Sequence, residues 1–373
     1  MWAKPRKERV MLPYYPALRA KPGEFAACGR LAPRYQGYVC PRFVVPPPTE
    51  SDPEKGRVPT LDEIAHIMGE RLGKSWPHRR AFLDPQLAAA ALGDEGVATL
   101  FRIATAVNAR LLPVLTIADL TNPARQALIR NGDVRTGIYI DFEEVDPAAL
   151  VEAVKKAGLR PEHCVLFVDF TGAPLGADFA PAIGEIFDQL DGAARWSKIV
   201  YQASAYPDKL PVGANERTLI ARAEWTTFQA ALKETDVQPD RLAYGDFGAD
   251  CGRMMFPKGK GGGRPRPHLR YTGKSHTLVV RGSDSGTFTP TMRDVCKQII
   301  ESKEYSGRSF SPADDRIWRN AKGLTETCGD ATGWRELNTA HHLVRIVKDL
   351  GAMSGIEFEE DAVSEYSEQE SLF

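Results

Sequence analysis

The chain has 373 residues, of which 43% are apolar, and its formal net charge is −1. A chain of this length holds one large domain with additions or two ordinary domains, and its apolar content excludes disorder throughout. The nearly balanced charge excludes a protein that binds nucleic acid with its whole surface, so any such role requires a local basic patch.

The cysteines and the N-terminal segment indicate where the protein resides. The six cysteines form no C-x-x-C pair, which predicts reduced structural thiols and gives no zinc site. The first residues, MWAKPRKERVML, are basic, but no apolar run of signal-peptide length follows them. No run reaches the ~18 apolar residues of a membrane span. We therefore expect a cytoplasmic protein that makes no contact with a membrane.

Short apolar runs alternate with longer amphipathic runs, a pattern typical of βα units and a parallel sheet. The runs are apolar throughout, as expected of strands buried on both faces. A helix is expected directly after each of the first seven runs, with residues 215–232 as the helix after the seventh. The eight predicted strands are 10–19, 39–48, 80–84, 111–119, 137–142, 164–170, 197–204 and 241–247.

Eight such units in about 240 residues match the size of a (β/α)8 TIM barrel, which typically has ~250 residues. The competing arrangement is an open doubly wound sheet, but no G-x-G-x-x-G turn follows the first strand. The sequence therefore predicts an α/β protein with a TIM-barrel-like fold, an insertion after strand 8 and a C-terminal helical extension.

The rhythm of the units breaks after the eighth strand. We expect an insertion at about 248–287 in the last βα loop, residues 288–302 as the eighth barrel helix, and a further helix at 334–351 packed outside. The final stretch is acidic and is expected to be mobile. The predicted division is a barrel domain over 1–305, a helical extension over 306–355 and an acidic tail over 356–373.

Four aspartates lie at the ends of predicted strands, and three of them precede a phenylalanine: Asp84, Asp141, Asp169 and Asp246. The carboxyl ends of barrel strands form the rim where active sites lie. Neighbouring carboxylates there could bind a divalent cation or act as an acid/base pair. Asp also caps turns for purely local reasons. We predict Asp141, Asp169 and Asp246 as catalytic residues, with the phenylalanines packed under the helices.

Other residues are predicted to bind substrate. Asp84 lies near the carboxylates, Arg19 and Lys21 follow the first strand, and Gln202 and Tyr206 follow the seventh. A basic loop in the insertion carries Lys258, Lys260, Arg264 and Arg266, with no acid between residues 257 and 275. Placed over the rim, this loop could bind phosphate groups of a nucleotide or of nucleic acid; the other possibility is a solvated loop.

The opening segment, YYPALRAKPGEFAACGRL followed by PRFVVPPP, resembles the start of the beta-protein family of phages and bacteria. The later segments GDFG, LRYTG, VVRG and GWRELNTAHH resemble the C-terminal half of that family. The resemblance implies a protein of phages or mobile elements that acts in phage–host conflict, such as antiviral defence, and implies no catalytic residues. The opening residues that match are Tyr15, Pro16, Leu18, Lys21, Gly23 and Glu24.

Three functions remain open at this stage. The first is hydrolysis of a phosphate-containing or nucleotide substrate, in which the carboxylates hold a divalent cation or one of them serves as general base. The second is a non-catalytic recognition or scaffold component with a protein partner in a defence or counter-defence complex. The third is nucleic-acid binding through the basic loop, residues 258–274, which predicts strong salt dependence.

Overall fold

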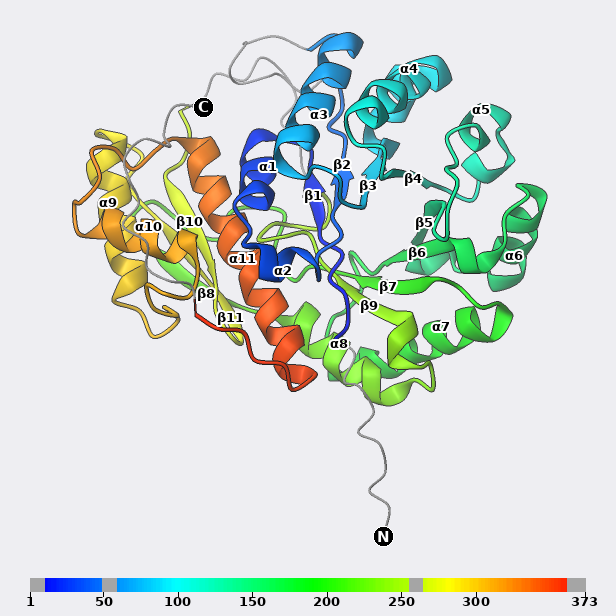
Figure 1. Ribbon diagram of the computed structural model, residues 1–373. Helices are drawn as coiled ribbons and strands as arrows, with labels where there is room; N and C mark the ends of the chain where they lie inside the picture. Colours follow the sequence, from blue (N-terminus) through cyan, green and yellow to red (C-terminus); the bar gives the residue numbers. More distant parts are fainter. Residues whose placement is uncertain (1–10, 49–58, 255–263, 361–373) are drawn as a thin grey trace.

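The structure is a computed structural model that describes residues 11–48, 59–254 and 264–360. Eight parallel strands form one sheet in the order β1-β2-β3-β4-β5-β6-β7-β9 (Figure 1). These strands are β1 Ala17–Arg19, β2 Arg42–Val44, β3 Ala81–Asp84, β4 Leu111–Leu115, β5 Thr136–Asp141, β6 Cys164–Asp169, β7 Lys198–Gln202 and β9 Leu242–Gly245.

Hydrogen bonds between the first and last strands close this sheet into a barrel. The backbone N–H groups of Tyr15 and Ala17 donate to the carbonyls of Tyr244 and Asp246 at 2.8 and 2.7 Å. The prediction of an α/β, TIM-barrel-like fold is thereby confirmed. All eight predicted strand regions contain a barrel strand, although the first strand is shorter than the run around it.

Helices cover the outside of the barrel, and several begin at the signals in the sequence. Thr60 and Glu63 form a reciprocal capping box at the start of α3. Asp146 caps α6 by accepting from the Ala149 N–H at 3.0 Å, with Pro147 in the first turn. The covering helices are α1 Pro22–Gly29, α2 Pro33–Gln36, α3 Leu61–Ser75, α4 Gln86–Val107, α5 Pro123–Gln126, α6 Pro147–Lys156, α7 Ala180–Ala193 and α8 Ala223–Glu234.

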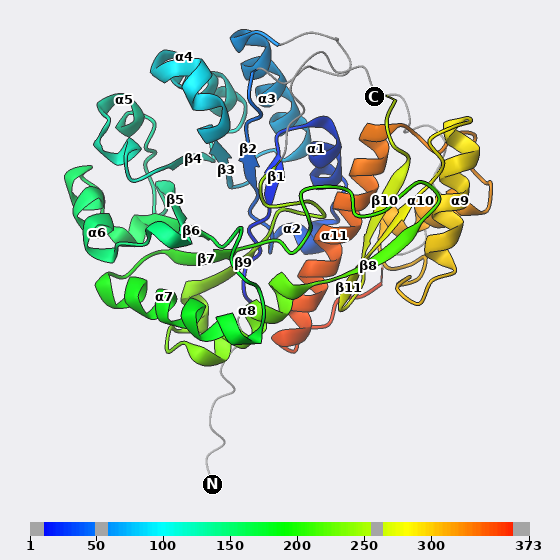
Figure 2. The same cartoon turned by 180° about the vertical axis from the view of Figure 1, so that it is seen from behind.

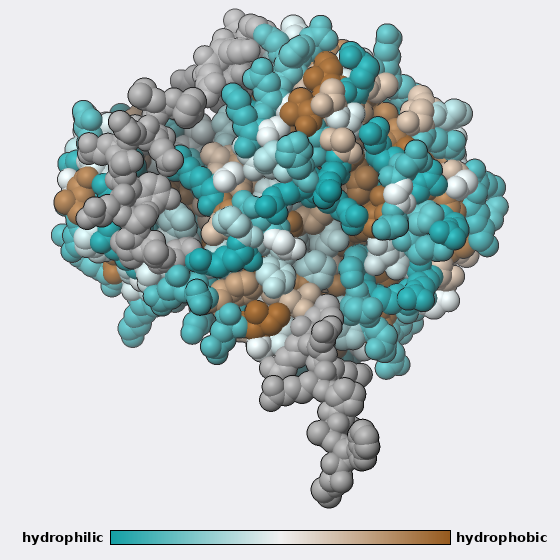
Figure 3. Space-filling view, in the orientation of Figure 1, coloured by the Kyte–Doolittle hydropathy of each residue, from teal (hydrophilic) through white to brown (hydrophobic). Residues whose placement is uncertain are grey.

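Side chains alternate along each barrel strand between two buried layers. In β6, Val165 and Phe167 face the barrel interior, whereas Leu166 and Val168 pack against the helices. Both layers are apolar, which explains why the strands read as continuous apolar runs. The polar helix faces turn outward, and the face shown in Figure 3 is mostly hydrophilic with apolar side chains in small groups.

A second, smaller unit lies beside the barrel in both views (Figures 1 and 2). Its antiparallel sheet has the order β10-β11-β8, and α9, α10 and the first part of α11 enclose its apolar cluster. The elements are β8 Arg217–Ala221, β10 His268–Thr272, β11 His276–Arg281, α9 Phe288–Ile300, α10 Pro312–Ala321 and α11 Ala331–Met353.

Two expectations about this region are wrong. Residues 215–232 do not form one helix, because 217–221 pair with β11 as strand β8 before α8 begins at Ala223. The eighth barrel helix is not 288–302 either, because α9 packs within the smaller unit.

The long helix α11 takes the place of an eighth barrel helix and packs against α1. It can do so because it is apolar on two sides. Its early residues Trp334 and Leu337 belong to the small unit, and later residues such as Leu343 and Val347 belong to the barrel core.

The chain after α11 turns back over the barrel. Ile356 and Phe358, expected in a mobile tail, pack against the barrel core, and the Phe358 ring lies 5.3 Å from that of Tyr35. Residues 361–373 lie outside the described part of the chain. The domain limits at 305 and 355 stay a prediction. Within the described residues, no helix is both long and apolar enough to cross a bilayer.

Candidate functional site

Polar side chains line the inside of the barrel at the carboxyl ends of its strands. Each of them lies two positions from a residue of the apolar interior, so it faces the same way. Sequence reasoning found all but one of them; it missed Arg42, whose only signal is a charged residue within an otherwise apolar strand. The six are Arg19, Arg42, Asp84, Asp141, Asp169 and Gln202. Arg42 is the exception in position, since it begins β2 and lies in register with Phe82, one layer below Asp84.

Arg42 and Asp84 form an internal pair in this mouth. The Nη1 of Arg42 lies 3.4 Å from the Oδ2 of Asp84, and both side chains are buried. The guanidinium also lies over the rings of Tyr139 and Phe167, at 5.2 and 5.4 Å from their centroids. Burial raises the pKa of the Asp84 carboxyl, and the Arg42 charge offsets part of that rise. Asp84 therefore holds Arg42 in place, and it also caps the next helix through the Gln86 N–H.

Asp141 and Asp169 are neighbours in register on β5 and β6. Adjacent strands lie about 4.8 Å apart and register partners point the same way, so these two carboxyl groups lie side by side. Asp169 is buried and accepts hydrogen bonds from the Tyr139 hydroxyl at 2.9 Å and the Thr171 N–H at 2.8 Å. Burial raises its pKa, although Arg42 and these hydrogen bonds act against the rise. Asp141 is half-buried and accepts from the Glu143 N–H at 3.0 Å.

The structure does not bring Asp246 to this pair. Its side chain points into the helix layer, where it accepts from the Tyr14 hydroxyl at 2.5 Å and lies 2.9 Å from the Nε2 of His342 on α11. Phe247 correspondingly faces the mouth and packs with Ala17. The expectation that all three phenylalanines pack under the helices is wrong for Phe247.

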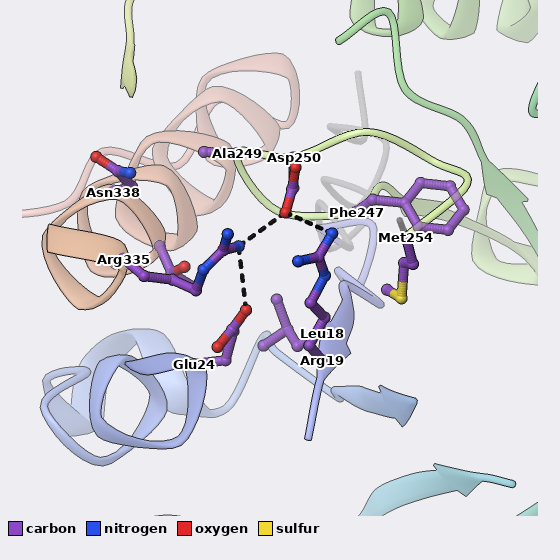
Figure 4. Close-up of a pocket in the computed structure, with 10 residues that line it drawn as sticks. Leu18, Arg19, Glu24, Phe247, Ala249, Asp250, Met254, Arg335 and Asn338 are labelled. Carbon is purple, nitrogen blue, oxygen red and sulfur yellow. Dashed lines mark hydrogen bonds and ion pairs between the residues drawn. The ribbon is translucent and has the colours of Figure 1, made fainter. Parts of the chain in front are cut away.

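A cluster of arginines surrounds Asp250, in the loop after β9 (Figure 4). The carboxylate accepts from Arg270 at 2.5 Å and Arg335 at 2.7 Å, and it pairs with Arg19 at 3.0 Å. Burial raises the pKa of Asp250, but the three guanidiniums outweigh that effect and hold the pKa well below its usual range. Sequence reasoning missed Asp250 and Arg335, since they lie far apart in the chain and no local pattern joins them.

A small pocket opens beside this cluster. Figure 4 shows Arg19 and Arg335 reaching Asp250 from opposite sides, with Phe247 and Met254 at one edge of the pocket. Arg335 also donates to Glu24 at 3.3 Å, and burial raises the pKa of the Glu24 carboxyl despite that contact. Three guanidiniums and two carboxylates thus lie together in this cluster.

The loop 247–254 connects the arginine cluster with the carboxylate pair. Its Phe247 and Met254 pack into the mouth, and its Asp250 carbonyl accepts from the Ser204 hydroxyl at 2.8 Å. Gly252 approaches the end of β6 so closely that a Cβ atom there would lie 2.2 Å from the Oγ1 of Thr171. Thr171 in turn donates its backbone N–H to Asp169. The loop 247–254 therefore lies between the arginine cluster around Asp250 and the pair of Asp141 and Asp169.

Three other residues expected to bind substrate lie at the same end of the barrel. Lys21 lies between β1 and α1 as the N-cap of that helix. Gln202 is fully buried; its Nε2 donates to the Asp246 carbonyl at 3.2 Å, while its Oε1 has no hydrogen-bond partner among the described residues. The Tyr206 ring lies under the Arg270 guanidinium at 4.3 Å, and burial raises its pKa to about 12.

The basic loop is only partly described. Lys258 and Lys260 lie outside the described residues. Arg264 donates to the Gly286 carbonyl and lies 4.6 Å over the Phe288 ring, so it is bound to the smaller unit. Arg266 is exposed. The positions of Arg264 and Arg266 give no direct support for a basic loop that covers the mouth.

The described residues contain no group of three or more His, Cys, Asp or Glu side chains arranged to hold a metal ion. The divalent cation that the four strand-end aspartates suggested therefore has no ligand set in this part of the chain. What the mouth does offer is a carboxyl pair, a buried amide oxygen and a cationic cluster.

A closed parallel barrel with charged side chains at the carboxyl ends of its strands defines a (β/α)8-barrel protein. The family model described as Beta protein matches residues 14–348. The chain therefore belongs to that family, as the resemblance of its opening and later segments predicted.

Two solved structures show a distant likeness. A psychrophilic glycoside hydrolase family 10 endo-β-1,4-xylanase shares 11% identity at a TM-score of 0.27, over 59% of this chain and 70% of the xylanase. The biosynthetic arginine decarboxylase of Campylobacter jejuni shares 13% identity at a TM-score of 0.31, over 91% of this chain and 61% of the decarboxylase. Likenesses of this size carry no argument about the reaction. No curated protein sequence matches the chain.

Proposed function

We propose that the barrel mouth is the active site of a hydrolase that acts on a phosphate-containing or nucleotide substrate. The observation that carries this proposal is the register pairing of Asp141 with Asp169, which are unequally buried. Two neighbouring carboxyl groups in different environments divide the roles of acid and base between them. The likeness of the chain to proteins of phages and bacteria supports a role of this activity in phage–host conflict, such as antiviral defence.

Each group then has a defined role. Asp141, which solvent reaches, accepts a proton from the attacking water as general base. Asp169 serves as the general acid that donates a proton to the leaving group, and burial, which raises its pKa, favours its protonated form. The guanidinium of Arg335, which lines the pocket, binds the phosphate, and the Oε1 of Gln202 accepts a hydrogen bond from the substrate. This mechanism uses no metal ion.

The test compares two conservative variants with a matched control. The full chain is incubated with nucleoside mono-, di- and triphosphates and dinucleotides, and the products are separated by chromatography. Asp141→Asn and Asp169→Asn are each expected to lower turnover about 100-fold or more, the usual contribution of a general acid or base. The control is Asp236→Asn. Asp236 is exposed in the loop before β9, at the opposite end of the barrel, so this variant should leave turnover unchanged. Full turnover in a folded Asp141→Asn, Asp169→Asn double variant would reject the proposal.

One observation favours a second candidate, a non-catalytic recognition or scaffold component of a defence or counter-defence complex. The loop 247–254 packs apolar side chains into the mouth, and Asp250 pairs with the arginines beside it. A scaffold of this kind would retain a protein partner through purification, and the Asp141→Asn, Asp169→Asn double variant would retain it equally. Loss of that partner on replacing 251–282 would assign the contact to the insertion.

A further inference from the structure

A second hollow lies outside the barrel mouth, between α1, α10 and α11. Together with the adjoining solvent it encloses about 580 Å³, and its floor is apolar, with Leu31, Ala313, Leu337 and Val344 among its lining residues. Arginines stand around this floor, one just after α1 and two on α10. An apolar floor with a basic rim fits a segment that alternates apolar and acidic residues.

The charges around the groove favour an acidic occupant. Arg30 pairs with Glu336 at 2.7 Å across the groove, and Asp315 accepts from Arg308, which does not line it. Arg316, on the same helix as Asp315, is exposed. With both lining acids engaged by other arginines, the exposed guanidinium of Arg316 gives the α10 side of the groove a positive charge.

The described chain ends at one end of this groove. After α11 the backbone folds back, and the Phe358 ring packs between those of Tyr35 and Tyr38 at 5.3 and 5.5 Å. The next contact is the Ser309 hydroxyl, which donates to Glu360. Ser309 stands just before Pro312, which begins α10 and lines the groove. Whatever follows Glu360 therefore starts beside the groove.

The thirteen residues after Glu360 have the matching composition. The sequence DAVSEYSEQESLF carries four acids, no lysine or arginine, and apolar side chains between the acids. Thirteen extended residues reach about 43 Å, whereas the ten residues of α10 span only about 15 Å. Attachment to the same chain also provides a high effective concentration, on the order of millimolar.

We propose that the C-terminal segment 361–373 docks in the groove between α1, α10 and α11. Its carboxylates pair with Arg316, and its apolar side chains cover Leu337 and Val344. The two helices that form the floor also carry Glu24 and Arg335 of the mouth cluster. The docked segment is a strap that holds α1 against α11 close to the mouth.

The first experiment measures docking within the intact chain. Arginines of the full chain and of a chain ending at Glu360 are labelled with phenylglyoxal and quantified by mass spectrometry. Arg316 should react several-fold more slowly in the full chain, while the exposed Arg102 on α4 should react equally in both. Equal reactivity of Arg316 in the two chains overturns the proposal.

The second experiment measures the interaction in trans. A synthetic peptide of residues 361–373 is titrated by calorimetry into both chains, after circular dichroism has shown that both are folded. The peptide should bind the shortened chain and not the full chain, whose groove is occupied. R316E in the shortened chain should weaken binding about tenfold, because attraction becomes repulsion, whereas R102E should not. Equal binding to both chains means that the groove serves a partner, which also overturns the proposal.

Discussion

The ends of β6 and β9 carry the same dipeptide, Asp-Phe, in opposite orientations. At the end of β6, Asp169 faces the barrel interior and Phe170 packs in the helix layer, where it stacks on Tyr201 at 5.2 Å. At the end of β9, Asp246 lies in the helix layer and Phe247 faces the mouth. A shift of one residue in the alternation exchanges the two faces.

As a consequence, Asp169 points toward the candidate site, whereas Asp246 stabilises the folded structure. Asp246, His342 and Thr272 form a buried chain of hydrogen bonds, since the Nδ1 of His342 lies 2.8 Å from the Thr272 hydroxyl. This chain joins a barrel strand, helix α11 and strand β10 of the smaller unit. Asp169 joins only neighbours at the mouth, Tyr139 and Thr171. Position at a strand end therefore does not by itself assign a carboxylate to the site.

Removing Asp246 should destabilise the protein more than removing Asp169. Asp246→Ala leaves the Tyr14 hydroxyl and the His342 ring buried without their partner. Each such group costs about 1–3 kcal/mol, so we expect the free energy of unfolding to fall by about 4 kcal/mol. Asp169→Ala should cost only about 1–2 kcal/mol, because water at the mouth reaches the groups left behind. Urea unfolding of both variants measures the difference, and equal losses would contradict the distinction.

Asp250 in the arginine cluster and Asp169 in the mouth should affect the pH dependence of stability in opposite directions. The folded pKa of Asp250 lies below the unfolded value of about 3.9, so its stabilising contribution is present above that pH and is lost as the pH falls. Asp169 has a raised folded pKa, so its contribution falls as the pH rises from about 4 through that pKa.

Urea unfolding between pH 3 and pH 7 checks both signs. Relative to the parent chain, Asp250→Asn should lose stability as the pH rises, because the variant lacks the gain that the ionised carboxylate provides. Asp169→Asn should improve relative to the parent over the same change, because it lacks the buried charge. If the stabilities of both variants relative to the parent changed in the same direction as the pH rises, the opposite signs assigned to Asp250 and Asp169 would be wrong.

The sequence was sufficient for the barrel because continuous apolar runs and helix signals such as Thr60 with Glu63 are local. The same continuity hid the face of each strand-end residue. Both layers around β9 are apolar, so nothing in AYGDFG indicates that Tyr244, and with it Asp246, faces the helices. Strand β8 was hidden inside a helical pattern, since its pairing with β11 depends on residues nearly sixty positions away.

The candidate site could be predicted only in part: the carboxylate pair could be found from the sequence, but the arginine cluster could not. Asp141 and Asp169 follow from strand ends alone, and their register pairing requires only that consecutive parallel strands be neighbours. The cluster around Asp250 depends on Arg19, Arg270 and Arg335, which come from three distant segments. Only the docking of α11 and the smaller unit on the barrel brings them together.

Adding a methyl group at Gly137 tests the orientation of the Phe167 and Asp169 side chains without changing a carboxylate. A Cβ atom at Gly137 would lie 2.7 Å from the Cε2 of Phe167 and 3.0 Å from the Cδ1 of Phe82. Both rings fill the interior below Asp169, so Gly137→Ala should cost about 1–3 kcal/mol through overpacking. Gly192→Ala is the control, because nothing lies within 4 Å of its Cβ on α7, and we expect a gain of about 0.5–1 kcal/mol. If Gly137→Ala unfolds at the same urea concentration as the parent, Phe167 does not occupy the interior and the orientation assigned to Asp169 is wrong.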